Sequence, residues 1–140
     1  MGTLKVEVHE VEGMQLLART GSGFAFVMDS PKDNGGLEQG PRPKEMLLAA
    51  LAGCTAMDVI SILKKMQEPL EKLVVNVEGE TAEEHPKYIK KIILTYVAYG
   101  NVNEDNLKKA IELSQQKYCG VSATLRPDIE KEIRWEIRHD

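Results

Sequence analysis

A long apolar segment in the middle of the chain limits the possible folds more than any other feature. Residues 46–66 read MLLAALAGCTAMDVISILKKM, with apolar side chains on nearly every side, and Pro43 suits the first turn of a helix. The segment therefore predicts a central, mostly buried helix that ends near Gln67. Its uninterrupted apolar run is far shorter than the about 20 residues needed to span a bilayer, so we expect it in a protein core and not in a membrane.

β-Strand patterns lie on both sides of the predicted helix. Before it, apolar residues within 4–8, 14–18 and 24–28 are separated by glycine-containing turns, which predicts a meander of three short strands. After it, the β-branched and aromatic stretches 73–77 and 89–99 predict a long antiparallel hairpin. We therefore expect antiparallel sheets around a central buried helix.

The last third of the chain predicts one more helix and one more strand. Asn103 can cap a helix that stops at Cys119-Gly120, and residues 129–137 alternate apolar and charged side chains, as in a strand with one face in water. The complete order is βββ-α-ββ-α-β, which belongs to the α+β class. A chain of 140 residues fits a single domain over residues 1–140.

The segment before the central helix is unusually rich in residues that break regular structure. Residues 30–44, SPKDNGGLEQGPRPK, contain three prolines, three glycines and one aliphatic residue. A loop of about 15 residues without regular structure is long enough to be functional. The segment is either a lid or binding segment, or a plain connector.

Charge and the N-terminal sequence exclude several kinds of partner. The net charge is −4, and no run of Lys or Arg exceeds two residues, so we expect neither a nucleic-acid partner nor an anionic membrane surface. The first residues, MGTLKVEVHEVEG, alternate apolar and charged residues and form neither a signal peptide nor a transit peptide. We therefore expect a cytoplasmic protein.

Cys54 lies within the predicted helix on a polar stripe. Asp58, Ser61 and Lys65 follow it by 4, 7 and 11 residues, which places all four on one side of an otherwise apolar helix. A reactive cysteine must be a thiolate, and Cys54 lies about 15 Å from the start of the helix, too far for the helix dipole to stabilise that charge. Two interpretations remain. Either Cys54 is reactive and a cation from another part of the structure stabilises its thiolate, or Cys54 is a small core residue beside a buried, hydrogen-bonded Asp58.

Cys119 lies where the second predicted helix meets Gly120, and it is either exposed and mobile or packed at the helix end. The two cysteines are 65 residues apart without a CxxC motif, and the three histidines show no ligand spacing to each other or to a cysteine. The sequence therefore predicts no metal site. It contains no P-loop and no GxGxxG pattern, which excludes nucleotide chemistry.

Two stretches that contain these cysteines resemble the OsmC/Ohr family, the osmotically inducible and organic hydroperoxide resistance proteins. Residues 40–54, GPRPKEMLLAALAGC, resemble the family's G-x-x-P-x-E-x-L-x-A-A-x-x-x-C motif, and residues 119–122, CGVS, resemble its C-x-V-S motif. The meander before the first motif, the hairpin between the two and the closing strand extend the resemblance to the whole chain.

The resemblance implies an intertwined homodimer with two active sites at the subunit interface, acting as a thiol peroxidase on organic hydroperoxides. Cys54 is the expected nucleophile, which becomes a sulfenic acid, and Cys119 is expected to condense with it to a disulfide. An external small or protein dithiol then reduces the disulfide by exchange. The resemblance implies neither a metal nor an organic cofactor.

One position departs from the family's peroxidases. They have a glutamate directly after the motif proline, whereas this chain has Lys44 there and Glu45 one residue later, about 100° further round the helix. This order resembles the YhfA-like branch. We assign Arg42 and Lys44 as candidate cations for the thiolate, Glu45 to orient that cation, and Asp58 to support the reacting groups. The alternative is a non-catalytic dimer on the same fold that binds a small apolar ligand or senses thiol redox state.

Overall fold

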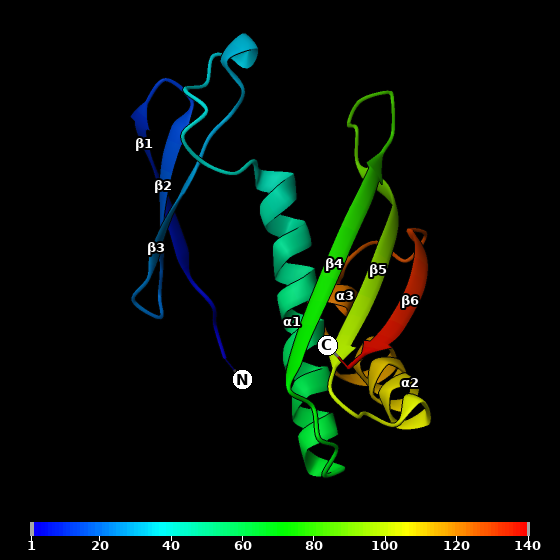
Figure 1. Cartoon of the computed structure of the whole chain (residues 1–140). Coiled ribbons are helices and arrows are strands. Elements are labelled where there is room, and N and C mark those ends of the chain that lie inside the picture. Colours follow the sequence, from blue (N-terminus) through cyan, green and yellow to red (C-terminus); the bar gives the residue numbers. More distant parts are fainter. Residues whose placement is uncertain (1, 140) are drawn as a thin grey trace. The chain divides into compact units, whose positions relative to one another are not determined.

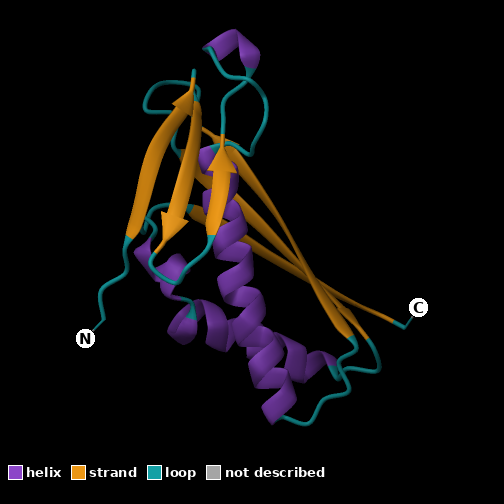
Figure 2. Cartoon of the chain, turned by 90° about the vertical axis from the view of Figure 1, so that its left-hand side faces the viewer, coloured by secondary structure: helices purple, strands orange, loops and turns teal. Residues whose placement is uncertain are grey.

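The structure is a computed structural model that describes residues 2–139. The chain divides into two compact units, one up to residue 47 and one from residue 48. The N-terminal unit is an antiparallel sheet in the order β1-β2-β3 (Figures 1 and 2). Its strands are β1 (Val6–Glu12), β2 (Gln15–Thr20) and β3 (Ala25–Met28), so the predicted meander is confirmed. The prediction of one domain over the whole chain stays a prediction.

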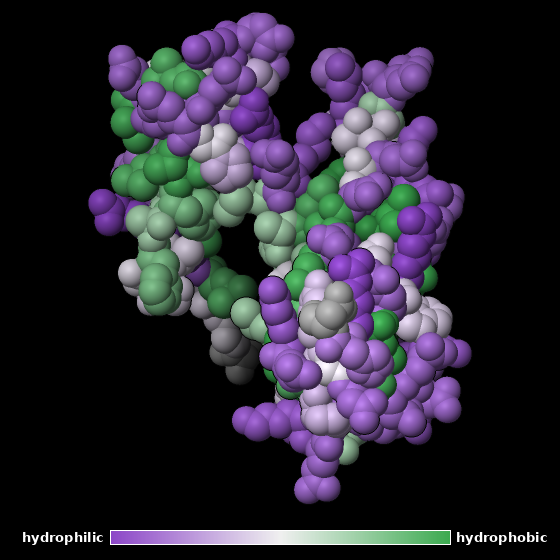
Figure 3. Space-filling view, in the orientation of Figure 1, coloured by the Kyte–Doolittle hydropathy of each residue, from purple (hydrophilic) through white to green (hydrophobic). Residues whose placement is uncertain are grey.

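Apolar side chains of the N-terminal unit lie on its surface. Every residue of β1 is exposed, and Val6 keeps 59% of its accessible surface in the single chain. Phe24, in the turn before β3, is 72% exposed. Figure 3 shows apolar residues gathered over these strands. Contiguous exposed apolar surface of this kind is typical of an interaction site.

The second unit contains a sheet in the order β4-β5-β6. β4 (Lys72–Thr81) and β5 (Ile89–Tyr99) form the predicted antiparallel hairpin, whereas β6 (Glu130–Arg138) pairs with β5 in parallel along its whole length. The expectation of purely antiparallel sheets is therefore wrong for β6. The chain between β5 and β6 is long enough to return to the other end of the sheet, which a parallel pair requires.

Helical elements form this return connection. α2 (Glu104–Leu113) begins after the predicted cap Asn103, whose side chain accepts a backbone N–H at 3.0 Å. The chain continues as one π-helical turn, η2 (Ser114–Tyr118), and then as the short helix α3 (Gly120–Thr124). The predicted end of the helix at residues 119–120 is confirmed.

The central helix, α1 (Pro43–Lys65), begins at the predicted proline and ends two residues before the predicted end. Its length and apolar composition would allow it to cross a membrane, contrary to the short apolar run expected from the sequence. In the single chain its fully buried residues form one stripe at four-residue spacing, so α1 is less buried than predicted. The stripe consists of Leu51, Thr55, Val59 and Leu63.

The core of the second unit lies between its sheet and its helices. Leu94 and Tyr96 on β5 are completely buried, as are Leu63 on α1 and Leu107 on α2. Burial of each leucine contributes about 1.5–3 kcal/mol. The same core holds the middle of α1 next to the turn that follows α2, and this arrangement positions the two cysteines.

Candidate functional site

The structure brings the two distant cysteines together within the second unit. The Sγ atoms of Cys54 and Cys119 and a carboxylate oxygen of Asp58 all lie within 4.8 Å of one another. Cys54 and Asp58 come from successive turns of α1, and Cys119 directly follows η2. Both cysteines are free thiols. Cys119 is buried, and the other two residues are half-buried.

Backbone contacts hold Cys119 at the end of the π-helical turn. Its N–H donates to the carbonyl oxygen of Ser114 at 2.7 Å, and its sulfur accepts the N–H of Ser122 at 3.4 Å. Burial raises the pKa of the Cys119 thiol, the Ser122 N–H opposes this effect, and the neighbouring Cys54 and Asp58 raise the pKa further. Cys119 is therefore a protonated thiol near neutral pH.

A series of buried hydroxyl groups connects Asp58 to the centre of the sheet. Ser114 donates to Asp58 Oδ2 at 2.8 Å. Thr55 Oγ1 lies 2.7 Å from the hydroxyl of Ser114 and 2.7 Å from that of Tyr96. A hydroxyl has one proton, so Thr55 must donate to Ser114, and Tyr96 must donate to Thr55. Burial raises the pKa of Tyr96, which keeps its proton in place. All three protons point toward the Asp58 carboxylate.

Gln115 extends this network to β6. Its side-chain NH₂ donates to Thr55 Oγ1 and to the Tyr96 hydroxyl, each at 3.1 Å. Its Oε1 accepts from the Ser122 hydroxyl at 3.1 Å, and that hydroxyl accepts from Lys131 Nζ at 2.5 Å. A directed hydrogen-bond network therefore runs from an exposed ammonium group to the carboxylate beside the cysteines.

Sequence reasoning missed this network. Thr55 stands in the stripe of buried α1 residues at four-residue spacing, where the other three members are apolar. A hydroxyl at a position that periodicity assigns to the core indicates a buried hydrogen bond, because an unpaired buried hydroxyl is costly. Ser114 gives the same signal, because it continues the apolar helix face of Leu107, Ala110 and Ile111, whereas Gln115 gives none.

A groove of about 370 Å³ opens beside Asp58. Three of the four members of the polar stripe predicted on α1, Asp58, Ser61 and Lys65, line its wall, whereas neither cysteine does. The remaining lining side chains are mostly apolar. They are Ile62, Met66, Leu113 and Tyr118. The groove gives small molecules access to Asp58, which lies beside the cysteines.

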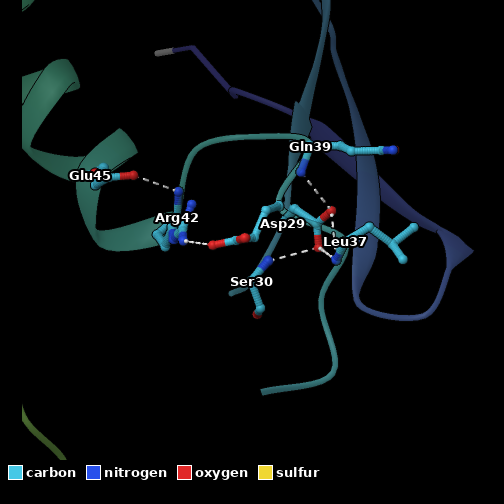
Figure 4. Close-up of polar contacts among 7 residues, drawn as sticks. Asp29, Ser30, Leu37, Gln39, Arg42 and Glu45 are labelled. Carbon is cyan, nitrogen blue, oxygen red and sulfur yellow. Dashed lines mark hydrogen bonds and ion pairs between the residues drawn. The ribbon is translucent and has the colours of Figure 1, made fainter. Parts of the chain in front are cut away.

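Arg42 and Glu45 contact each other at the start of α1 (Figure 4). The Arg42 N–H donates to the Glu45 carboxylate at 2.9 Å, which is the contact of a helix cap. The Arg42 guanidinium pairs with Glu38 at 3.4 Å. Lys44 lies in the same turn with an exposed side chain. The roles assigned to these residues at the thiolate stay predictions.

The loop before α1 is held by a buried carboxylate. Asp29 accepts the backbone N–H groups of Ser30, Leu37 and Gln39 at 2.7, 3.2 and 3.1 Å (Figure 4). Burial raises the pKa of Asp29, but the three N–H donors outweigh burial and hold it below its ordinary value. A one-turn helix, η1 (Lys32–Asn34), lies within the loop. These contacts argue against a plain connector.

The fold and the site define an α+β protein with two neighbouring thiols, one on a long helix and one after a π-helical turn. Residues 34–134 match the family model described as OsmC-like protein, and the chain belongs to this family. The OsmC/Ohr resemblance of the two cysteine motifs is thereby confirmed.

Individual relatives agree with this assignment. The chain is 32% identical over 135 residues to Protein YhfA of Escherichia coli (strain K12), a match that covers 96% of this chain and 98% of that protein. A crystal structure of a hypothetical protein from Aquifex aeolicus VF5 has 32% identity and a TM-score of 0.89, covering 100% of this chain and 99% of the other.

A more distant structure shares the fold. It is an organic hydroperoxide resistance protein OsmC from Legionella pneumophila, with 16% identity and a TM-score of 0.72, covering 99% of this chain and 98% of the other. The resemblance to the YhfA-like branch is therefore confirmed at the level of sequence, and the wider OsmC/Ohr likeness at the level of fold.

Proposed function

We propose that the protein reduces organic hydroperoxides with Cys54 and Cys119. The observation that supports this proposal is the pair of thiols whose sulfur atoms lie within 4.8 Å of each other. Membership of the OsmC-like family adds support, as do solved structures of the same fold described as organic hydroperoxide resistance proteins. The mostly apolar groove beside Asp58 suits an organic peroxide.

The proposed reaction has three balanced steps. The Cys54 thiolate attacks the terminal peroxide oxygen, an S–O bond forms as the O–O bond breaks, and the departing alkoxide takes a proton to become an alcohol. The Cys119 sulfur then attacks the Cys54 sulfenic acid, which releases water and forms a disulfide. An external dithiol reduces this disulfide by exchange and is itself oxidised.

Cys54 is proposed as the nucleophile because of its exposure. It is half-buried, whereas Cys119 is buried and its pKa is raised. The attacking species is the thiolate, and a buried thiol with a raised pKa supplies little of it. Cys119 suits the second step, in which only a short approach to Cys54 is required.

The Cys54 thiolate of the first step carries negative charge beside Asp58, and a nearby cation would balance that charge. We keep Arg42 and Lys44 as the proposed source of positive charge, with Glu45 to orient it. Replacing each cation in turn by glutamine, and measuring the rate of Cys54 alkylation against pH, tests the assignment. A replacement that leaves the rate unchanged removes that residue from the mechanism.

A homodimer is the proposed assembly. Besides β1, the helix α1 leaves large apolar side chains on its surface, including Met57, which is 73% exposed, and Ile60, which is 44% exposed. A second copy of the chain that covers these residues would remove them from water, which is favourable. The proposed setting for the reducible thiols is the cytoplasm, where thiols are kept reduced.

Peroxide consumption by single-cysteine variants tests the proposed function. Cumene hydroperoxide and dithiothreitol are supplied to the parent, to Cys54→Ser and to Cys119→Ser, with Thr81→Val, at the exposed end of β4, as a control that keeps both sulfurs and the groove. We expect Cys54→Ser to lose activity and Thr81→Val to retain it. Non-reducing mass analysis after one equivalent of peroxide should show an intramolecular disulfide in the parent. Equal rates for the parent and Cys54→Ser contradict the proposal.

The alternative is a dimer without catalytic turnover that binds a small apolar ligand or senses thiol redox state. The groove beside Asp58 favours it, because about 370 Å³ is enough for a small apolar molecule. A ligand-binding protein leaves both thiols reduced after one equivalent of peroxide, whereas a sensor forms the disulfide but reacts with the dithiol too slowly to sustain peroxide consumption. The same assay therefore distinguishes the two functions.

A further inference from the structure

Three side chains at the cysteine site have the chemistry of metal ligands. Thiolate sulfur and carboxylate oxygen both bind Zn²⁺, and a pair of sulfur ligands favours Zn²⁺ and the chemically similar Cd²⁺ over Mg²⁺ and Ca²⁺. We propose that Cys54, Cys119 and Asp58 form a binding site for a thiophilic divalent cation of the Zn²⁺ class. The sequence predicted no metal site because the cysteines are 65 residues apart along the chain, but the fold brings them close together in space.

The distances between the ligand atoms fit such an ion. Tetrahedral zinc, with bonds of about 2.3 Å to sulfur and about 2.0–2.2 Å to oxygen, places two of its ligand atoms about 3.5–3.8 Å apart. The two sulfurs and the Asp58 oxygen already lie within 4.8 Å of one another. About 1 Å of closure, shared among three side chains, is enough to reach coordination distance.

Hydrogen bonds hold two of the ligands in position. Ser114 donates to Asp58 Oδ2 at 2.8 Å and is itself fixed by Thr55 at 2.7 Å. The Ser122 N–H donates to the Cys119 sulfur at 3.4 Å. Because the Ser114 hydroxyl and the Ser122 N–H donate to atoms that carry negative charge in the complex, they stabilise the deprotonated ligands. Ligands of functional metal sites are oriented by contacts of this kind.

The site also has a route of access. Asp58 lines the groove of about 370 Å³, and Ser61 and Lys65 line the same wall. An incoming ion can therefore reach the carboxylate before it contacts the sulfurs. Three protein ligands leave the fourth position of tetrahedral zinc for water or a small molecule.

Metal binding changes protonation and leaves the oxidation state unchanged. The two thiols lose their protons to solvent, two metal–sulfur bonds and one metal–oxygen bond replace bonds between the hydrated ion and water, and no electron is transferred. Sulfur atoms that are bound to the ion cannot attack a peroxide or condense with each other. The bound cation therefore inhibits the dithiol chemistry, and a chelator that removes the cation reverses this inhibition.

Titration of the reduced chain with Cd²⁺ tests this proposal without any peroxide. Thiolate–cadmium bonds absorb in the ultraviolet, and we expect saturation at one ion per chain, with about two protons released per ion. Competition with Zn²⁺ should remove the absorbance. We expect Cys54→Ser and Cys119→Ser to lose most of it. An absence of thiolate–cadmium absorbance at one equivalent overturns the proposal.

Asp58→Asn isolates the third ligand. Asparagine keeps the shape of the side chain and can still accept the Ser114 hydroxyl, so the fold is retained, and circular dichroism checks this. We expect Cd²⁺ affinity to fall at least tenfold in Asp58→Asn and about tenfold in Ser114→Ala, which loses the orienting donor. Glu112→Gln, an exposed acid on α2, is the matched control for loss of charge. Equal affinities in Asp58→Asn and Glu112→Gln overturn the assignment of Asp58.

The metal proposal and the peroxidase proposal can fail separately. Absence of Cd²⁺ binding together with peroxide turnover that depends on Cys54 removes the metal site alone. Tight Cd²⁺ binding by a chain without turnover removes the peroxidase function alone.

Discussion

The substitution Thr55→Val removes one completely buried hydroxyl and changes the side-chain shape little. That hydroxyl uses its one proton toward Ser114 and both lone pairs toward Tyr96 and Gln115. A hydrogen bond contributes about 0.5–1.5 kcal/mol net. After the change, Ser114 still donates to Asp58, and Tyr96 still accepts from Gln115. We therefore expect a loss of about 2–3 kcal/mol in unfolding free energy, and a melting temperature lower by about 6–12 °C.

Urea denaturation measures this loss. The fluorescence of Trp135, the one tryptophan of the chain, reports unfolding of the sheet, and all variants are compared at one protein concentration because association shifts apparent stability. Thr81→Val, at the exposed end of β4, is the matched control and should change stability by less than about 0.5 kcal/mol. If Thr55→Val lies within that range of the control, the buried network does not stabilise the fold.

Three further substitutions test other parts of the structure by the same denaturation assay. Leu63→Ala removes a completely buried side chain and should cost about 2–5 kcal/mol, and a smaller loss would mean that α1 repacks. Gly100→Ala should cost more than Gly23→Ala: both glycines have positive φ, but only at Gly100 would a Cβ lie 2.5 Å from a backbone oxygen, that of Pro69. Asp29→Asn should destabilise the chain at neutral pH. The pKa of Asp29 in the folded chain is below its ordinary value of 3.8, so the difference in stability between the parent and Asp29→Asn should disappear as the pH falls through that folded pKa. A difference in stability that is independent of pH would contradict this prediction.

The order of elements could be predicted because each segment has its own periodicity. The alternation in residues 129–137 identified β6, and Asn103 identified the start of α2. The direction of β6 could not be predicted in this way, because parallel and antiparallel strands with one wet face have the same alternation. The exposure of α1 was also missed, because an apolar helix surface looks the same in the sequence whether one chain or two cover it.

The candidate site was predictable only in part. Periodicity placed Cys54 and Asp58 on one side of α1, and the structure confirms that they are neighbours. The position of Cys119 beside them followed from the family resemblance, since no local pattern relates residues 65 positions apart. The hydroxyl network was beyond sequence reasoning because its members come from α1, β5 and η2, whose contacts exist only after folding.

The single π-helical turn limits how this segment can change in evolution. The Cys119 N–H reaches the carbonyl of Ser114, five residues earlier, so this turn contains one residue more than an α-helical turn. Its side chains differ in their contacts, because Ser114 and Gln115 bind the buried hydroxyl network, whereas Gln116 and Lys117 are exposed. Homologous sequences that retain both thiols should therefore keep hydrogen-bonding side chains at positions 114 and 115 and vary freely in residue type at positions 116 and 117.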